Sequence, residues 1–286
     1  MKWRPSDAFR MLDAIDWQRP WLAPVRDLAQ PAPAAGNWVD AFNVAATERR
    51  LCNHQGLPIR FVSQEALSPG ESYEAFISAT GQVPTRMNLH DFFNALVWLA
   101  FPAAKAQLNA MQAAEIAARA QVQPGSDMIA GAGEGRLATG STSRGKLRDR
   151  VTIFDENAAV LLSADSGREA HLRNHRWQAA LFEDRAAFGR SCELQLFGHA
   201  LLEKLVKPYK AITAHVWILR LPQGYAAANW PQRRAMLDGL LSDALQQGLL
   251  ETPSTPLPVL GVPGWWPHQD AAFYADATVF RPKRGK

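Results

Sequence analysis

The chain has few of the features that mark disulfide-rich, membrane-spanning or nucleic-acid-binding proteins. Its two cysteines, Cys52 and Cys192, lie far apart and without metal-type spacing, so we expect reduced thiols in a cytoplasmic protein. The longest apolar run, 95–104, contains a proline and is far shorter than the roughly 20 residues of a membrane-spanning helix, so no membrane association is predicted. The formal net charge is only +4, an excess too small to indicate a nucleic-acid partner.

Motifs of the well-understood enzyme classes are missing as well. The sequence contains no H-E-x-x-H, G-x-S-x-G, Walker-type loop, paired C-x-x-C or zinc-deaminase pattern. Residues 133–138 read G-E-G-R-L-A and fit G-x-G-x-x-A, but no strand is predicted before them and no helix clearly follows, so a dinucleotide site is not indicated. The N-terminus lacks an uninterrupted apolar segment, so no signal peptide is predicted.

What the chain does have is length and apolar content. Its 286 residues are 47% hydrophobic, enough to bury a sizeable core, and we expect residues 1–286 to form a single domain. The Pro- and Ala-rich run at 30–36 favours an N-terminal arm over residues 1–36. A Gly- and Ser-rich stretch predicts a mobile loop at 123–145.

The hydrophobic periodicity predicts an α+β fold. Helices are expected at residues 6–15, 37–51, 73–80, within 84–101, and at 103–121, 173–188, 194–206 and 231–248; strands are expected at 58–62, 151–154, 158–163 and 212–221. Residues 155–157 are interpreted as the turn of a hairpin. The expected architecture is a helix-rich body, a small mainly antiparallel sheet and an irregular C-terminal segment.

The segment 84–101 carries the first candidate residues. It places His90, Asp91 and Asn94 on a helix that is otherwise apolar all round, and buried polar groups need partners. Two interpretations stay open for each candidate. Asn88 is a good N-cap, so Asp91 can be a capping carboxylate, and His90 can be a hydrogen-bonded core histidine. Alternatively, the three side chains converge on one catalytic pocket.

Two further segments contribute a histidine and several carboxylates. His199, Glu203 and Lys207 recur every four residues along one predicted helix face, a pattern that fits a solvated stripe or an acid–base or metal pair. Asp155 and Glu156 fit a hairpin turn, or a metal site that takes carboxylate oxygens from a loop. The enrichment of His and carboxylate in three separate segments favours a catalytic site.

Several cations and aromatic residues are candidates for substrate binding. Arg86, Lys207 and Lys210 would bind an anionic group such as a phosphate or carboxylate. Trp265 and Trp266 would line a ligand or partner groove in the C-terminal segment, although packing alone also explains them.

Four segments resemble the signature blocks of a bacterial domain-of-unknown-function family, number thirty-twenty-five (DUF3025). They read P-T-R-M-N-L-H-D-F-F-N-A-L-V-W-L at 84–99, R-D-R-V-T-I-F-D-E-N at 148–157, F-G-H-A-L-L-E-K-L-V-K-P-Y-K-A-I-T-A-H at 197–215 and P-V-L-G-V-P-G-W-W-P at 258–267. This resemblance spans most of the chain and implies a relative without supplying a mechanism. Relatives usually carry Gly after D-E-N, where this chain has Ala158.

The sequence leaves two classes of function open. The first is a metal-assisted hydrolase for an anionic small molecule, in which a divalent ion lowers the pKa of bound water. Its candidate ligands are His90, Asp155, Glu156, His199 and Glu203. The second is a non-catalytic ligand- or partner-binding protein, in which the same residues form a buried polar network that stabilises helix packing.

Overall fold

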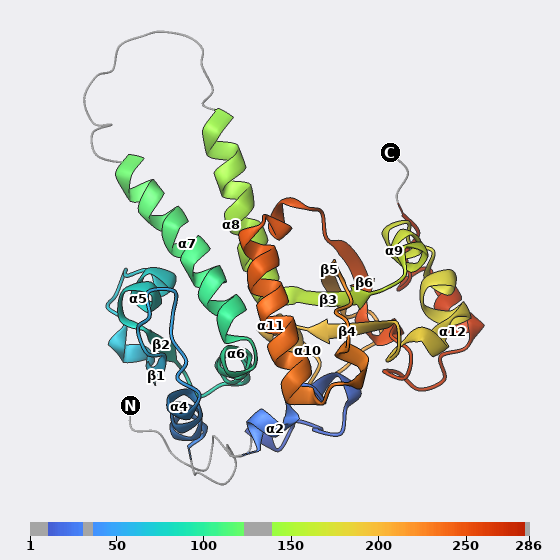
Figure 1. Ribbon diagram of the computed structural model, residues 1–286, viewed down its shortest axis with the longest axis horizontal. Coiled ribbons are helices and arrows are strands. Elements are labelled where there is room, and N and C mark those ends of the chain that lie inside the picture. The colour runs from blue at the N-terminus through green and yellow to red at the C-terminus, as the bar shows by residue number, and fades with distance from the viewer. Residues whose placement is uncertain (1–10, 31–36, 123–138, 284–286) are drawn as a thin grey trace.

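The molecule has a helical part and a part built on a four-stranded sheet, and long helices lie between them (Figure 1). The computed structural model describes residues 11–30, 37–122 and 139–283. The helical part contains α4 (Trp38–Glu48), β1 (Arg60–Ser63), α5 (Tyr73–Thr80), β2 (Gln82–Thr85), α6 (Leu89–Ala100) and α7 (Pro102–Val122). The other part contains α8 (Thr139–Asn157), β3 (Ala158–Ser163), α9 (Ser166–Arg173), β4 (Cys192–Leu196), α10 (His199–Lys204), β5 (Thr213–Arg220), α11 (Trp230–Gln246), β6 (Thr255–Pro258) and α12 (Ala271–Ala275).

The predicted α+β class, with a helix-rich body, a small mainly antiparallel sheet and an irregular C-terminal segment, is confirmed. The larger sheet has the order β4-β3-β5-β6, with β3 and β5 parallel at its centre and an antiparallel strand on each side. Its central strand β3 reads A-A-V-L-L-S and is buried along its whole length, as expected for a strand covered on both faces. Two parallel strands, β1 and β2, form a separate small sheet.

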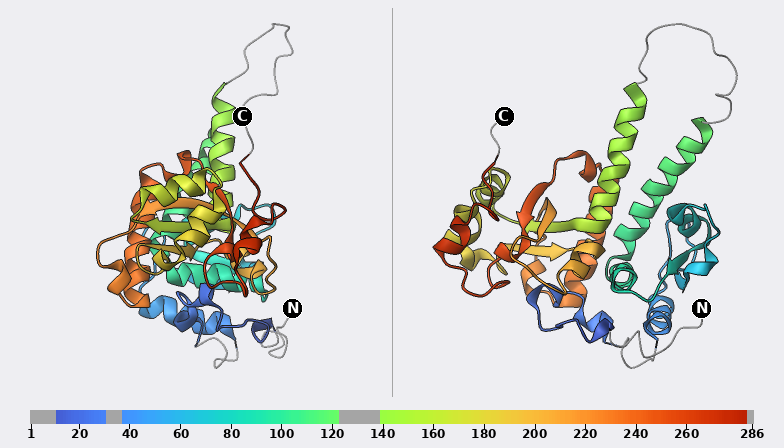
Figure 2. Two further views of the ribbon diagram at one scale, coloured as in Figure 1. Left: turned by 90° about the vertical axis from the view of Figure 1, so that its right-hand side faces the viewer. Right: turned by 180° about the vertical axis from the view of Figure 1, so that it is seen from behind.

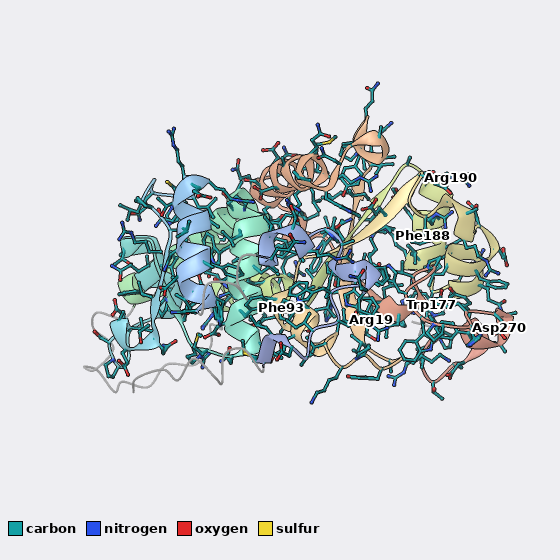
Figure 3. The ribbon with its side chains drawn as sticks, turned by 90° about the horizontal axis from the view of Figure 1, so that it is seen from below. Arg19, Phe93, Trp177, Phe188, Arg190 and Asp270 are labelled. Atoms are coloured by element: carbon teal, nitrogen blue, oxygen red, sulfur yellow. The ribbon has the colours of Figure 1, made fainter. Side chains whose placement is uncertain are left out.

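Helix α6 is the core of the helical part, as predicted. Asn88 caps it, because its side-chain oxygen accepts a 2.7 Å hydrogen bond from the backbone N–H of Asp91. Every residue from Asp91 to Ala100 is buried, and Phe92 makes an edge contact with Trp38 of α4 at 5.4 Å between ring centroids. In the view from below, Phe93 of α6 lies near the middle of the molecule, far from the C-terminal end (Figure 3).

Two features hold the elements around α6 in place. Gly81 ends α5 with a left-handed φ of 71°, and an added Cβ would lie 2.4 Å from the carbonyl oxygen of Pro58, so only glycine allows β2 to lie beside β1. At the start of α7, the carboxylate of Asp238 in α11 accepts hydrogen bonds from the backbone N–H groups of Ala103 and Ala104. An acceptor from another helix therefore caps α7 and connects it to α11.

Helices α7 and α8 run side by side and project from the body (Figures 1 and 2). Residues 123–138 of the predicted loop lie outside the described residues, as do the G-x-G-x-x-A segment and residues 1–10 and 31–36 of the predicted arm. Residues 139–145 belong to α8, so the predicted loop boundary at residue 145 is wrong. Residues 20–22 and 26–29 form the short helices η1 (Pro20–Leu22) and α2 (Arg26–Ala29), which bury apolar side chains. In the described part of the chain, no helix is both long and apolar enough to cross a bilayer.

The predicted hairpin at 151–163 is wrong. Residues 151–157 form the last two turns of α8, and β3 follows without a turn. Val151 and Phe154 are buried at helical spacing, and the Phe154 ring packs 5.0 Å from both Phe197 and Trp217. This packing overrides the strand preference of V-T-I-F. Asp155 is therefore a helix residue rather than a turn residue.

The predicted helix at 194–206 begins too early. Residues 192–196 form β4, an antiparallel partner of β3, and the helix α10 starts only at His199. Gly198 lies against the junction of α8 and β3, because its N–H donates to the Ala158 carbonyl and an added Cβ would lie 2.5 Å from Glu156 O and Asn157 N. This close approach brings the start of α10 next to the end of α8.

Two other predicted segments differ in the structure: the helix expected at 173–188 and part of the irregular C-terminal segment. The helix expected at 173–188 is replaced by the end of α9, a π-turn η3 (Gln178–Glu183) and a short 3-10 turn η4 (Arg185–Ala187), because His175 adopts a positive φ of 54°. In the C-terminal segment, residues 255–258 pair with β5 as the edge strand β6, where proline is tolerated. Short 3-10 turns η5 (Tyr225–Ala227), η6 (Leu249–Glu251) and η7 (Val259–Gly261), together with η2 (Gln64–Ala66), make further connections.

The contact at Gly198 predicts a specific effect of substitution. Gly198→Ala would push α10 away from backbone atoms that cannot move independently, and we expect it to lower the free energy of unfolding by about 1–3 kcal/mol. Gly239→Ala is the matched control, because Gly239 lies in α11 with open space around it and should gain about 0.5–1 kcal/mol. Chemical denaturation of both variants tests this, and equal behaviour would contradict the packing argument.

Candidate metal centre

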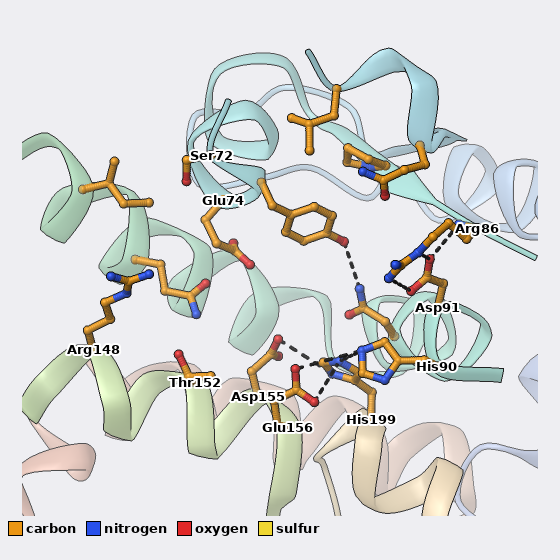
Figure 4. Close-up of a pocket in the computed structure, with 17 residues that line it drawn as sticks. Ser72, Glu74, Arg86, His90, Asp91, Arg148, Thr152, Asp155, Glu156 and His199 are labelled. Carbon is orange, nitrogen blue, oxygen red and sulfur yellow. Dashed lines mark hydrogen bonds and ion pairs between the residues drawn. The ribbon is translucent and has the colours of Figure 1, made fainter. Parts of the chain in front are cut away.

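Three segments bring one histidine or glutamate each to a single point. His90 lies in the first turn of α6, Glu156 in the last turn of α8, and His199 is the first residue of α10. The two histidine Nε2 atoms are 3.1 Å apart, and the Glu156 carboxylate oxygens lie 3.5 Å from His199 Nε2 and 4.0 Å from His90 Nε2. One ligand atom from each of the three residues lies within 4.8 Å of the others (Figure 4). This is the donor set of a His₂Glu metal site.

A carboxylate lies near the Nδ1 atom of each imidazole ring. His90 Nδ1 is 3.1 Å from Glu203 Oε2, and because an ionised carboxylate only accepts, the proton of His90 is on Nδ1. His199 Nδ1 is 3.7 Å from Asp155 Oδ2, too far for a hydrogen bond to that oxygen, although His199 is almost fully buried. In both rings Nε2 therefore faces the shared point while Nδ1 faces a carboxylate. This arrangement is typical of metal-bound histidines.

A buried chain of polar groups holds Asp155 in place. Lys105 of α7 donates to Asp155 Oδ1 at 2.5 Å and to Asn94 Oδ1 at 2.9 Å. The Asn94 amide nitrogen in turn donates to the hydroxyl of Tyr73 at 3.1 Å. The chain joins α5, α6, α7 and α8, and each of its polar groups has a partner, as buried polar groups require.

A cavity of about 490 Å³ opens over these groups, a size that suits a small-molecule ligand. His90, Glu156 and His199 lie along its wall together with Arg86, Asp91, Asn94, Asp155, Tyr73, Glu74, Gln112, Arg148 and Thr152. Figure 4 shows Arg86 and Arg148 on opposite sides of the space and Glu74 above the two acidic residues of α8. The candidate centre is therefore accessible to a ligand from one side.

Burial and neighbouring charge set the protonation of the centre. Burial lowers the pKa of His199 to about 4, with Lys105 and His90 adding to the effect and Asp155 opposing it. The His199 imidazole is thus neutral at pH 7, the form that binds metals. Burial alone would raise the pKa of Asp155, but Lys105 and the two histidines hold it below its ordinary value. Burial raises the pKa of Glu156, while His90 opposes the rise.

The predicted catalytic and metal-binding residues lie close together, but they do not all face the same point. Glu203 contacts the Nδ1 atom of His90 and does not face the two histidine Nε2 atoms. Asp91 accepts from the backbone N–H of Arg86 at 2.6 Å and from its guanidinium, so its carboxylate is tied to residue 86 instead of reaching back to the Asn88 backbone. Asn94 is part of the Lys105 chain and lines the cavity.

Other predicted substrate-binding residues lie outside the lining of this cavity. Lys207 is exposed and lies in the bend beyond the end of α10, so the predicted helix face does not extend to it, and Lys210 pairs with Asp276 at 2.7 Å near the C-terminal end. Trp265 lines a different cavity of about 370 Å³ and packs against Trp21 at 5.8 Å. Trp266 is a partly buried residue packed against the core. Of the predicted set, Arg86 alone lines the cavity at the candidate centre.

Lys105, Tyr73 and Glu74 are not among the residues predicted from the sequence. Lys105 falls on the same helix face as Ala104 and Leu108, which are both buried, so a charged residue on the apolar face of a predicted helix was the available signal. Tyr73 and Glu74 are the first two residues of α5 and carry no such signal, because only the packing of α5 on α7 turns them toward the cavity.

Most of the chain matches one known protein family. A family model described as "Protein of unknown function (DUF3025)" matches residues 59–284. The chain belongs to this family. The DUF3025 match contains α6, α8 and α10, so the whole candidate centre lies within the family region. No curated protein and no solved structure gives a significant match to the chain.

Glu74 provides a pH-dependent test of the cavity. Burial and the nearby Asp155 raise the pKa of Glu74 to about 7, against the opposing effects of Lys105 and Asn109. The folded protein therefore holds this proton more tightly than the unfolded chain, so stability is lost as the pH rises from about 4.5 to about 7. Glu74→Gln should remove that loss and be more stable than wild type at pH 8, by on the order of 2 kcal/mol, but not at pH 4. Urea denaturation across this pH range checks the prediction, and parallel profiles would contradict it.

Proposed function

We propose that His90, His199 and Glu156 bind a divalent metal ion, with zinc(II) as the first candidate, and that the protein is a metal-assisted hydrolase for an anionic small molecule. The observation that carries the proposal is the pair of histidine Nε2 atoms at 3.1 Å, each with its Nδ1 turned to a carboxylate. Two nitrogens bound to one tetrahedral zinc at about 2.0–2.1 Å lie roughly 3.3 Å apart, so the rings need little movement to bind it.

The protonation of the two rings favours a metal over a hydrogen-bonded network. In the non-catalytic alternative with both rings neutral, His199 Nε2 donates to His90 Nε2, because the His90 proton is on Nδ1; the other form of that network needs a cationic His90 that donates from both ring nitrogens. His199 Nδ1 would then be a buried acceptor with no donor, because Asp155 beside it only accepts. With a cation at the two Nε2 atoms, His199 Nδ1 carries the proton and directs it at the Asp155 carboxylate.

The donor set and the cavity favour catalysis over a purely structural metal. Structural zinc sites are closed by four protein ligands, whereas catalytic sites use three and leave a position for water or substrate. His90, His199 and Glu156 supply three ligand atoms, and the cavity of about 490 Å³ lies next to them. A zinc ion held there would supply a bound water of lowered pKa as the nucleophile.

The charges along the cavity favour an anionic substrate. Asp91 is paired with Arg86 and Asp155 with Lys105, whereas Glu156 makes its ion-pair contacts, among the described residues, only with the two histidines. A divalent cation would balance the charges of Glu156 and Glu203, the two carboxylates that contact the histidines without a lysine or arginine partner among the described residues. Arg86 and Arg148 line the same cavity, so a carboxylate or phosphate group would meet favourable charge.

Metal analysis of the purified protein tests the centre directly. We expect one zinc per chain after loading and dialysis, and loss of that zinc in His199→Ala and in Glu156→Ala, because each removes one of three ligands. His54→Ala is the matched control, because His54 bonds to Ser78 outside the cavity. Loaded wild type should hydrolyse p-nitrophenyl phosphate or an anionic p-nitrophenyl ester, and both a chelator and His199→Ala should abolish the activity. Equal metal content in all four proteins would refute the centre.

Glu203 should tune metal affinity without binding the metal. Glu203→Gln keeps the size of the side chain but weakens the acceptor for His90 Nδ1, so we expect zinc affinity to fall about 10- to 100-fold with little change in stability. Competition with a chromophoric chelator measures the affinity, and thermal unfolding of the metal-free protein measures the stability. An unchanged affinity would show that Glu203 does not support the centre.

A further inference from the structure

The orientation of the Asn94 side chain is determined by its neighbours. Lys105 Nζ is only a donor, so the atom of Asn94 that it contacts at 2.9 Å must be the amide oxygen. The amide nitrogen then points to the hydroxyl oxygen of Tyr73, 3.1 Å away. Because an amide nitrogen only donates, Tyr73 is the acceptor in this contact.

The hydroxyl proton of Tyr73 is consequently free for another partner. Asn94 occupies the oxygen as a donor, and within the described residues no second group is hydrogen-bonded to the Tyr73 hydroxyl. Tyr73 lines the cavity of the candidate centre. Burial, together with Glu74, Asp91 and Asp155, raises its pKa well above the ordinary value, which keeps the phenol protonated. The cavity therefore contains an oriented neutral donor.

Arg86 supplies a second oriented donor at the same place. Its Nε and Nη2 atoms bond to the two carboxylate oxygens of Asp91 at 2.9 and 3.2 Å. This two-pronged contact holds the guanidinium plane and leaves the Nη1 edge for a ligand. The side chain is 59% exposed, lines the same cavity, and lies near enough to Tyr73 for the two groups to interact electrostatically.

We propose that the Tyr73 hydroxyl and the Nη1 edge of Arg86 form an oxyanion-binding subsite beside the metal centre. The inference deepens the proposed function and rests on it in part, since it assigns the substrate class: a molecule whose reactive or neighbouring group is an oxyanion, either phosphoryl or carboxylate. Both donors are held by a second layer of polar residues, so they need no reorganisation when the ligand arrives. Asn94 and Asp91 are then positioning residues for the two donors.

Calorimetric titration with inorganic phosphate and with acetate tests the subsite. The proteins are wild type, Tyr73→Phe and Tyr274→Phe, each zinc-loaded and metal-free. We expect Tyr73→Phe to weaken the tighter-binding oxyanion about 10-fold or more, since a hydrogen bond to a charged group is lost. Tyr274→Phe is the matched control, because it removes a hydroxyl that bonds to the Gly261 carbonyl outside this cavity. Arg86→Lys keeps the charge but loses the planar fork, and should weaken the same ligand.

The outcomes separate this subsite from the metal centre. Tighter phosphate binding assigns a phosphoryl group, and tighter acetate binding assigns a carboxylate. If wild type holds no zinc, the proposed hydrolase fails, while oxyanion binding to the metal-free protein that is weakened by Tyr73→Phe would still support the subsite. The proposal is overturned if neither oxyanion binds wild type, or if folded Tyr73→Phe, verified by circular dichroism, binds as tightly as wild type.

Discussion

The buried ion pair between Lys105 and Asp155 is the contact on which the site depends. Both side chains are almost fully excluded from water, so loss of either would leave an uncompensated buried charge, which costs about 3–5 kcal/mol. The pair joins α7 to α8, places one Asp155 oxygen behind His199, and orients Asn94 through the remaining donors of Lys105. The histidine centre and the Tyr73 hydroxyl thus depend on one interaction.

The two histidines have different surroundings, and this difference suits a reactive site. His199 is buried, at the start of a short helix fixed by the close approach of Gly198 to the α8–β3 junction. His90 is only partly covered and lies on the cavity wall. A rigid ligand on one side and an accessible one on the other would hold an ion firmly and still leave it open to a substrate.

The predictions from sequence were most accurate where local signals agreed. The apolar helix α6 and its Asn88 cap were correctly located, and with them the candidate His90 and its neighbours Asp91 and Asn94. His199 and Glu203 lie within 3.1 Å of His90, although their exact contacts were not predictable. The errors at 151–157 and 194–196 share one cause: β-branched and leucine-rich segments of a few residues fit either period. Packing of Phe154 against Phe197 and Trp217 decided the first segment, and pairing of β4 with β3 decided the second.

The sequence by itself determined the α+β class, the buried helix α6, and the three segments from which the polar residues come, because apolar periodicity and capping are local properties. Only the tertiary structure decided that Glu156, rather than Glu203, faces the two Nε2 atoms, and that Lys105 and Tyr73 belong to the same site. Glu156 reaches its position because α8 continues into β3 without a turn, and Lys105 because α7 packs across α6. These contacts join residues from 11 to 109 positions apart on different helices, and local patterns carry no information on how separate helices pack.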